Sequence, residues 1–381
     1  MAFEFSFNVP TRIAFGPSSV DGLAPAVAEV GSRALVLAGH HSARASGLLD
    51  RCRDALRDAG VRTWLCDGIS SNPTYESVVA ARDTAVSAGV DAVVAIGGGS
   101  VMDAGRAVSL AMRRPDDFWE CRVTGTHSVP GIPAGLVPVF TVATAHGTGA
   151  EISPAALLRR GVVKEVFFSP HLFPRAAFVD PTLACSVPSR VTAEVGVDAF
   201  VQGLEAYVSR TAQPFSDVFA VQAMTLAAHW LPVAVADPAD PTARAHVALA
   251  ALVSLFAINQ AGVGGIHALS NPLSARYDVH HGRALGLVAA AVVDHNHSAA
   301  PERFGTVAAL LGGGPRAGRA ETVAALGGWL DGIGLGGRLR DAGVRAGDLD
   351  AMAAEAQNPD MSTNPRDLPP EAARKIYEAL M

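Results

Sequence analysis

The segment Ala92–Met112 places the strongest constraint on what this chain can fold into. It begins with the apolar, β-branched-rich run Ala92–Ile96, continues through Gly97-Gly98-Gly99-Ser100, and ends in a helical run, Val101–Met112. A short, fully apolar strand is typical of a parallel sheet buried on both faces. Three glycines leave the backbone uncovered, so its N–H groups can approach a pyrophosphate at the helix N-terminus. The alternative is a tight turn that needs positive φ.

The first 180 or so residues alternate strand-like and helical patterns. Further strands are expected at Ala34–Ala38 and Val137–Val142, and amphipathic helices at Ser46–Ala59 and Thr74–Gly89. Such alternation indicates a parallel α/β sheet. We therefore expect an α/β domain over residues 1–181.

From about Pro181 the pattern changes to long segments rich in Ala, Leu and Val. Helices are expected at Val191–Ser209, Pro214–Val235, Ala243–Gln260, Ala284–Asn296, Ala320–Ile333 and Glu371–Leu380. These lengths and periodicities predict a mostly helical second domain over residues 182–381.

Composition excludes several kinds of partner. A net charge of −6 gives no basic surface for nucleic acid or anionic membranes. No apolar run approaches the roughly 18 residues of a membrane span, and the N-terminus lacks a secretory signal. The four cysteines are scattered without metal-type spacing. We therefore expect a cytoplasmic protein with reduced thiols.

Motifs throughout the chain resemble those of the iron-containing (group III) alcohol dehydrogenases. They are Asn72-Pro73-Thr74, Gly97–Val108, Gly147–Glu151, Asp180-Pro181, Gly196–Ser209, Gly265–Gly282 and Asn364-Pro365-Arg366. The resemblance implies a Rossmann-like N-terminal domain and an all-α C-terminal domain, the fold shared with dehydroquinate synthases. It also implies NAD(P)H-dependent hydride transfer between a small aldehyde or ketone and its alcohol. Relatives are often dimers, so we expect a homo-oligomer.

Cofactor-binding residues follow from the glycine loop and from this resemblance. The loop and its helix provide Gly97, Gly98, Gly99, Ser100 and Asp103, and the resemblance adds Asn72, Thr144, Thr148 and Lys164. In the family, Thr144 and Thr148 would line the nicotinamide side and Lys164 would lie near the ribose. Arg106 stands where relatives usually carry lysine, which makes a direct cofactor contact there doubtful.

The end of the first central strand bears on cofactor choice. NAD-preferring relatives often carry an aspartate there for the ribose 2′-hydroxyl, whereas this chain has Gly39. His41, Ser42 and Arg44 instead offer donors to a 2′-phosphate. We therefore expect NADP(H) to be favoured over NAD(H), unless these residues form only an ordinary polar turn.

Metal ligands are implied by position within the family. Asp198 and Gln202 lie four residues apart on one helix face, and His267 and His281 match the two downstream histidine ligands. Relatives carry histidine where this chain has Gln202, whose neutral amide oxygen is a weaker ligand for Fe²⁺ or Zn²⁺. Gln202 is therefore an optional fourth ligand to a two-histidine, one-carboxylate set.

A second departure concerns the proton relay. Relatives commonly have a relay histidine where this chain has Asn271, which does not exchange protons near neutral pH. His280 and His146 are candidate replacements, and either could be a plain polar residue. The predicted catalytic residues are His267, His281 and His280.

Two other functions stay open at this point. The protein could be a metal-independent reductase of an acidic carbonyl substrate, with His267 and His281 as hydrogen-bond donors, as in the maleylacetate reductases. It could also be a repurposed lyase or cyclase. Glu205-Ala206-Tyr207 and Asn364-Pro365-Arg366 also match the family, and helix packing and a loop stop suffice to explain them.

Overall fold

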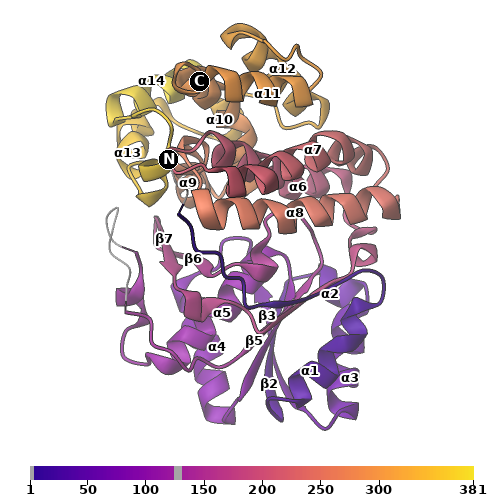
Figure 1. Ribbon diagram of the computed structural model, residues 1–381. Helices are drawn as coiled ribbons and strands as arrows, with labels where there is room; N and C mark the ends of the chain where they lie inside the picture. Colours follow the sequence, from indigo (N-terminus) through magenta and orange to yellow (C-terminus); the bar gives the residue numbers. More distant parts are fainter. Residues whose placement is uncertain (1–3, 124–130) are drawn as a thin grey trace. The chain divides into compact units, whose positions relative to one another are not determined.

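The computed structural model describes residues 4–123 and 131–381, and the chain divides into two compact units (Figure 1). The sheet unit is Asn8–Ala184. The helical unit is Cys185–Met381 together with Met1–Phe7, which the sequence analysis had included in the first domain.

The sheet unit contains eight strands among its described residues. These are β1 Arg12–Phe15, β2 Arg33–Gly39, β3 Arg62–Ile69, β4 Ala92–Gly97, β5 Val139–Ala143, β6 Ala155–Arg160, β7 Val163–Phe168 and β8 Ala176–Val179. Its α-helices are α1 Leu23–Ala28, α2 Ser42–Ala45, α3 Leu48–Asp58, α4 Tyr75–Ala88 and α5 Gly99–Arg113.

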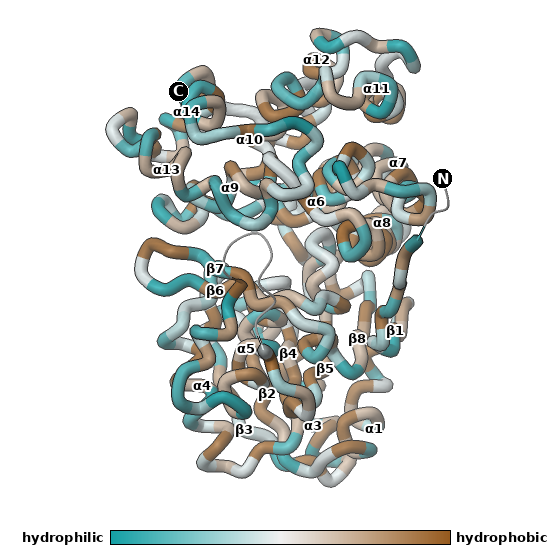
Figure 2. Tube along the Cα trace, turned by 60° about the vertical axis from the view of Figure 1, so that its left-hand side comes forward, coloured by the Kyte–Doolittle hydropathy of each residue, from teal (hydrophilic) through white to brown (hydrophobic). Residues whose placement is uncertain are grey.

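Six parallel strands form the main sheet, in the order β1-β8-β5-β4-β2-β3. Along β2, Leu35 and Leu37 point to the face packed by α4 and α5, while Val36 and Ala38 point to the face packed by α1 and α3. Burial on both faces explains why the central strands are almost wholly apolar (Figure 2). The predicted α/β architecture is confirmed.

The strand order also locates a ligand-binding edge. The series β3-β2-β4-β5-β8 is the flavodoxin-like version of the doubly wound sheet, and its topological switch point lies between β2 and β4. Ligands of such sheets bind outside the carboxyl ends of the strands at that point. These ends are Gly39 and Gly97.

The strands β6 and β7 form a separate antiparallel hairpin that the sequence analysis did not predict. It is fastened to α5, because the backbone N–H of Leu157 donates a hydrogen bond to Asp103 at 3.2 Å. The hairpin turns at Gly161, which has a φ of 62°.

The helical unit is all-α among its described residues. Its α-helices are α6 Ser189–Val208, α7 Pro214–Ala236, α8 Pro241–Ala261, α9 Gly265–Tyr277, α10 His281–Asn296, α11 Pro301–Leu310, α12 Arg319–Gly332, α13 Leu349–Glu355 and α14 Pro370–Leu380. The helix α6 lies at the centre and contributes Val197, Phe200 and Leu204 to the core. A Cβ on Gly282 would lie 1.5 Å from the carbonyl oxygen of Glu194, so α10 approaches α6 as closely as backbone allows.

The helices α7 and α8 are long and apolar enough, by length and composition alone, to cross a membrane. Core helices of soluble proteins meet the same criteria, and both helices supply side chains to the core around α6. Phe5, in the N-terminal segment of this unit, stacks on Phe215 of α7 with ring centroids 4.4 Å apart.

All predicted helices and strands lie within a few residues of observed elements, but several elements besides β6 and β7 were not predicted: α1, α2, α9, α11, α13, β1, β3 and β8. Among these, α9 carries the candidate ligand His267. Its sequence contains Pro272 and two residues of low helix propensity, Ser270 and Asn271. The residue before a proline is also biased away from the helical region. The local sequence pattern therefore gave no indication of the helix that carries His267.

Candidate active site

One face of α6 presents the polar residues of the helical unit's candidate site. Asp198, Gln202 and Glu205 are spaced by four and three residues, which places them on the same side of the helix. Each is at most 5% exposed. Buried polar side chains need partners, and α8, α9 and α10 provide them for these three residues.

Asp198, His267 and His281 come together from three different helices. Nε2 of His267 lies 3.2 Å from Oδ1 of Asp198, and Nε2 of His281 lies 3.9 Å from Oδ2. One ligand atom from each residue lies within 4.8 Å of the other two. The structure thus joins three of the four predicted metal ligands around one point.

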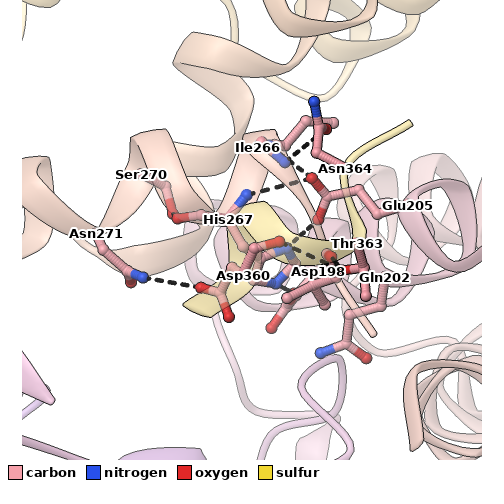
Figure 3. A network of polar contacts seen from close by, with 12 residues as sticks. Asp198, Gln202, Glu205, Ile266, His267, Ser270, Asn271, Asp360, Thr363 and Asn364 are labelled. Atoms are coloured by element: carbon pink, nitrogen blue, oxygen red, sulfur yellow. Dashed lines mark hydrogen bonds and ion pairs between the residues drawn. The ribbon is translucent and has the colours of Figure 1, made fainter. Parts of the chain in front are cut away.

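Glu205 lies on the other side of the His267 ring (Figure 3). Its Oε2 is 2.5 Å from Nδ1 of His267, and its Oε1 accepts a hydrogen bond from the backbone N–H of Ile266 at 2.6 Å. Oδ1 of Asn364 accepts the neighbouring N–H, that of Gly265, at 2.9 Å. Glu205 and Asn364 therefore do more than pack a helix and stop a loop, since together they cap the start of α9.

Gln202 is oriented by α8. The hydroxyl of Ser254 donates to Oε1 of Gln202 at 2.7 Å, and both side chains are buried. A carbonyl oxygen has two lone pairs, so the bond from Ser254 does not by itself prevent this oxygen from binding a metal. Whether Gln202 serves as a fourth ligand stays a prediction.

The candidate relay residues have separate environments. His280 is the residue before α10, and its Nδ1 lies 3.8 Å from Oε2 of the buried Glu194. Asn271, one helical turn after His267, donates to Oδ2 of Asp360 at 3.2 Å. His146 is buried in the sheet unit, in the loop after β5.

The electrostatics favour a cation at this position in the helical unit. Burial disfavours a charge on His267, but Glu205 and Asp198 outweigh that penalty and raise the pKa of His267 to about 10. The metal-free protein therefore holds a proton between two carboxylates at neutral pH. A set of two imidazole nitrogens and one carboxylate oxygen also suits Fe²⁺ or Zn²⁺, so the residues present fit a divalent metal.

The glycine loop of the sheet unit lies at the switch point between β2 and β4. A Cβ on Gly97 would meet Val101 at 2.5 Å, and one on Gly99 would meet Thr148 at 3.0 Å. A Cβ on Gly98 would meet nothing within 4 Å. Gly97 and Gly99 thus allow close packing, while Gly98 leaves its backbone open beside the N-terminus of α5, where a phosphate would be favoured.

Side chains near this loop mostly bind the protein itself. The Ser100 hydroxyl donates to the carbonyl of Ser71 at 2.6 Å, and Oγ1 of Thr148 accepts from the N–H of Ala150 at 3.1 Å. Asp103 pairs with the fully buried Arg106, which also donates to the carbonyl of Ala150. Arg106 therefore links α5 to the loop formed by residues 147–151.

The side chain of Asp103 is 14% exposed, and its carboxylate interacts electrostatically with Lys164 of the β6–β7 hairpin. Asn72 and Thr144 are buried, and the N–H of Thr144 donates to the carbonyl of Gly97 at 3.1 Å. The structure thus brings Thr144 to the glycine loop. Direct cofactor contacts of these residues stay predictions.

The expected 2′-phosphate region follows β2. Gly39 ends that strand, His41 precedes α2, and Ser42 begins it. Arg44, however, forms an ion pair with Asp67 of β3, with both side chains about half exposed. The sequence analysis did not consider Asp67, because nothing in the local pattern pairs it with Arg44.

Comparison with known proteins agrees with both units. Residues 10–181 match the family described as iron-containing alcohol dehydrogenase, and residues 192–381 match the C-terminal region of that family. The 1,3-propanediol dehydrogenase of Klebsiella pneumoniae is 31% identical over 380 residues, covering 95% of each chain. The NAD-dependent methanol dehydrogenase of Bacillus methanolicus is 28% identical, covering 95% of this chain and 96% of its own.

Solved structures give the same result. An archaeal halo-thermophilic alcohol dehydrogenase from a Red Sea brine pool superimposes with a TM-score of 0.95 at 26% identity, over 100% of both chains. A 1,3-propanediol oxidoreductase gives 0.91 at 29% identity, again over 100% of both. The chain belongs to the iron-containing alcohol dehydrogenases, and it is an oxidoreductase of the alcohol dehydrogenase class.

Proposed function

We propose that this protein is an NAD(P)H-dependent oxidoreductase that interconverts a small aldehyde or ketone and its alcohol, with a divalent metal held by Asp198, His267 and His281. The observation that carries the proposal is the convergence of these three ligands within 4.8 Å. Membership of the iron-containing alcohol dehydrogenases and the position of the glycine loop at the switch point support the use of a nicotinamide cofactor.

The residues of the site have distinct tasks in this proposal. Asp198 supplies the negative charge, and His267 and His281 supply neutral nitrogen ligands. A bound divalent ion would act as a Lewis acid on the carbonyl oxygen of the substrate, while the nicotinamide supplies or accepts the hydride. Gly97–Ser100 hold the cofactor pyrophosphate, with Thr144 and Thr148 near the nicotinamide.

Metal content and activity test this function together. We expect about one Fe or Zn per chain in protein purified without chelator, and oxidation of NADPH with short aldehydes that stops when the metal is removed. A metal content near zero that does not rise on incubation with either ion would contradict the metal-assisted reaction.

The replacement Asp198→Ala separates this function from a metal-independent one. Losing a Lewis acid worth several kcal/mol should lower kcat by about 10³-fold. Near-normal kcat in this variant would instead favour direct hydrogen bonding by the histidines. The contacts of His267 with Glu205 and Asp198, which favour a charged imidazole in the metal-free protein, support that alternative. His281→Ala should abolish turnover under either mechanism.

For the cofactor we propose NADP(H) over NAD(H), as Gly39 removes the usual carboxylate of NAD-preferring relatives. Asp67 opposes this choice by neutralising Arg44, and one relative is named as NAD-dependent. Measuring Kd for both cofactors in the unaltered protein and in Asp67→Asn tests the assignment. We expect tighter NADPH binding, and a further gain in Asp67→Asn. Tenfold tighter NADH binding by the unaltered protein would contradict it.

We assign proton exchange with solvent to His280. It is half-buried beside Glu194, whereas Asn271 lacks a titrating group and is bonded to Asp360. His280→Gln should lower kcat at neutral pH without weakening metal binding. Added imidazole should partly restore kcat, and unchanged turnover in the variant would reject this role.

We further propose a cytoplasmic homodimer. The helical unit exposes several apolar side chains, among them Phe5, Val218 and Leu249, and contact with a second copy would cover part of that surface. Light scattering during gel filtration checks this, since a dimer should elute with twice the chain mass of 39.2 kDa.

A further inference from the structure

We infer that Glu205 is a positioning residue that fixes which nitrogen of His267 faces the metal. This inference rests on the metal-assisted function proposed above. Nothing in the sequence pattern distinguishes Glu205 from a helix-packing residue, and its role follows from two sets of contacts made by one carboxylate.

The first contact is with the imidazole. Oε2 of Glu205 lies 2.5 Å from Nδ1 of His267, and the carboxylate can only accept, so Nδ1 carries the proton. The other nitrogen, Nε2, then faces Oδ1 of Asp198 at 3.2 Å. In a neutral imidazole only the unprotonated nitrogen can bind a metal, so Glu205 selects the ligand atom.

The second contact is with the backbone. Oε1 of Glu205 accepts from the N–H of Ile266 at 2.6 Å and approaches that of His267 at 3.4 Å. Glu205 thus fixes both the ring and the first turn of the helix that carries it. Because Glu205 is only 4% exposed, no water competes effectively for these bonds.

The weakness of this ligand set makes the contact consequential. The amide oxygen of Gln202 is a weaker ligand than an imidazole nitrogen, and Asp198 is the one anionic ligand in the described cluster. A carboxylate hydrogen-bonded to Nδ1 raises the basicity of Nε2, which strengthens a weak ligand set. Glu205 therefore supports the metal through His267 and without touching it.

The variant Glu205→Gln tests this role sharply. Glutamine keeps an oxygen for the N–H of Ile266, but its NH₂ group then faces Nδ1 and donates to it. The proton of a neutral His267 must move to Nε2, the metal-binding nitrogen. We expect metal-free Glu205→Gln to unfold near the temperature of the unaltered protein, yet to bind Zn²⁺ 10- to 100-fold more weakly, on the order seen for outer-shell changes.

The matched control is Asn364→Ala. Asn364 caps the neighbouring N–H of Gly265 and bonds Asn296 and the carbonyl of Arg366, and among the described residues none of its hydrogen bonds reaches the His267 ring. We expect this variant to lower the unfolding temperature and to change Zn²⁺ affinity much less than Glu205→Gln. Equal losses of affinity in the two variants would show that helix capping alone explains the effect, and would overturn the inference.

Affinity is measured by Zn²⁺ titration of the metal-stripped full-length protein against a chromophoric chelator. Absence of Zn²⁺ binding by the unaltered protein would overturn the metal-assisted function and this inference with it. Equal binding by the unaltered protein and Glu205→Gln would overturn this inference alone. A ¹⁵N spectrum of the zinc-loaded unaltered protein gives a test without any variant: it should show His267 protonated at Nδ1, and a proton at Nε2 would overturn the inference.

Discussion

In the sheet unit the candidate cofactor site is built mainly from backbone, whereas in the helical unit the candidate metal site is built from side chains. Gly98 leaves space beside the start of α5, with nothing within 4 Å of where its side chain would be. Asp198, His267 and His281 contribute their side-chain ends from three helices. The cofactor site requires positions without side chains, so that a phosphate can approach the backbone. The metal site requires particular side-chain atoms held in fixed positions.

The two units also bury charge differently. In the helical unit, His267 is bonded by Glu205 and Asp198 on both ring nitrogens. In the sheet unit, Glu151 is 1% exposed and its Oε1 has no hydrogen-bond partner among the described residues. A buried charge bonded on both sides holds a defined geometry, whereas a buried carboxylate with one unbonded oxygen costs stability and has a raised pKa.

The largest expected stability effect comes from Glu151. Burial raises its pKa from 4.5 to about 7, so between these values the folded state binds more protons than the unfolded state. This contribution to stability is complete below pH 4.5 and is lost as pH rises through 7. Glu151→Gln should therefore be more stable than the unaltered protein at pH 8, by about 3 kcal/mol at most, with little difference at pH 4.5.

Denaturant unfolding across this pH range measures the effect. Glu29→Gln, an exposed position in the same unit, serves as the control. Parallel pH profiles for Glu151→Gln and the unaltered protein would mean that Glu151 finds a partner in solution.

Gly282→Ala should damage the side-chain site through the fold. Its Cβ would lie 1.5 Å from the carbonyl oxygen of Glu194, so α10 must move away from α6. We expect a loss of about 1–3 kcal/mol and weaker metal binding, since His281 is the preceding residue. Thermal unfolding and Zn²⁺ titration check both parts, and retention of both would contradict the close packing described for this helix pair.

Gly98→Ala, unlike Gly282→Ala, should weaken ligand binding more than it weakens the fold. Its φ of −84° suits alanine and the added Cβ meets no atom within 4 Å, so the stability cost should be that of alanine in place of glycine at a helix N-cap, about 1 kcal/mol. The methyl group would nevertheless occupy the space that the pyrophosphate needs. We expect cofactor binding at least about tenfold weaker, a loss of about 1.4 kcal/mol, measured by fluorescence titration. Unchanged affinity would place the phosphates elsewhere.

The smallest expected effect is an increase in metal affinity. Gln202→His should tighten metal binding, because imidazole is a better ligand than an amide for Fe²⁺ or Zn²⁺. The gain is limited by Ser254, whose hydroxyl would lose its bond to the amide oxygen. Ser254→Ala alone is the control, and equal affinities in all three proteins would mean that position 202 does not face the ion.

Much of the sheet unit could be predicted because its signals are local. The apolar runs at Ala34–Ala38 and Ala92–Ile96 indicated strands buried on both faces, and Gly97–Gly99 indicated an uncovered turn before a helix. The helical unit was predicted less completely. The helix α9 escaped notice because Pro272 and its polar neighbours interrupt the pattern, although tertiary packing keeps it helical.

The site residues divide in the same way. The family resemblance was enough to select Asp198, His267 and His281, which the structure brings together. It gave no role to Glu205, Asn364 or Ser254, because each acts on a residue 52 or more positions away in the chain. It also left Arg44 available for a phosphate, whereas the fold pairs it with Asp67.

By itself, the sequence determined the two-part architecture, the glycine loop and the identity of the metal-binding candidates. The first two follow from periodicity and from the absence of side chains, which are properties of short segments, and the third follows from the family resemblance. Only the tertiary structure decided which nitrogen of His267 is directed at Asp198, which oxygen orients Gln202, and which buried carboxylate oxygen has no hydrogen-bond partner among the described residues. Those outcomes depend on contacts between helices and loops that are distant in sequence, where a hydrogen bond requires an alignment that no local pattern encodes.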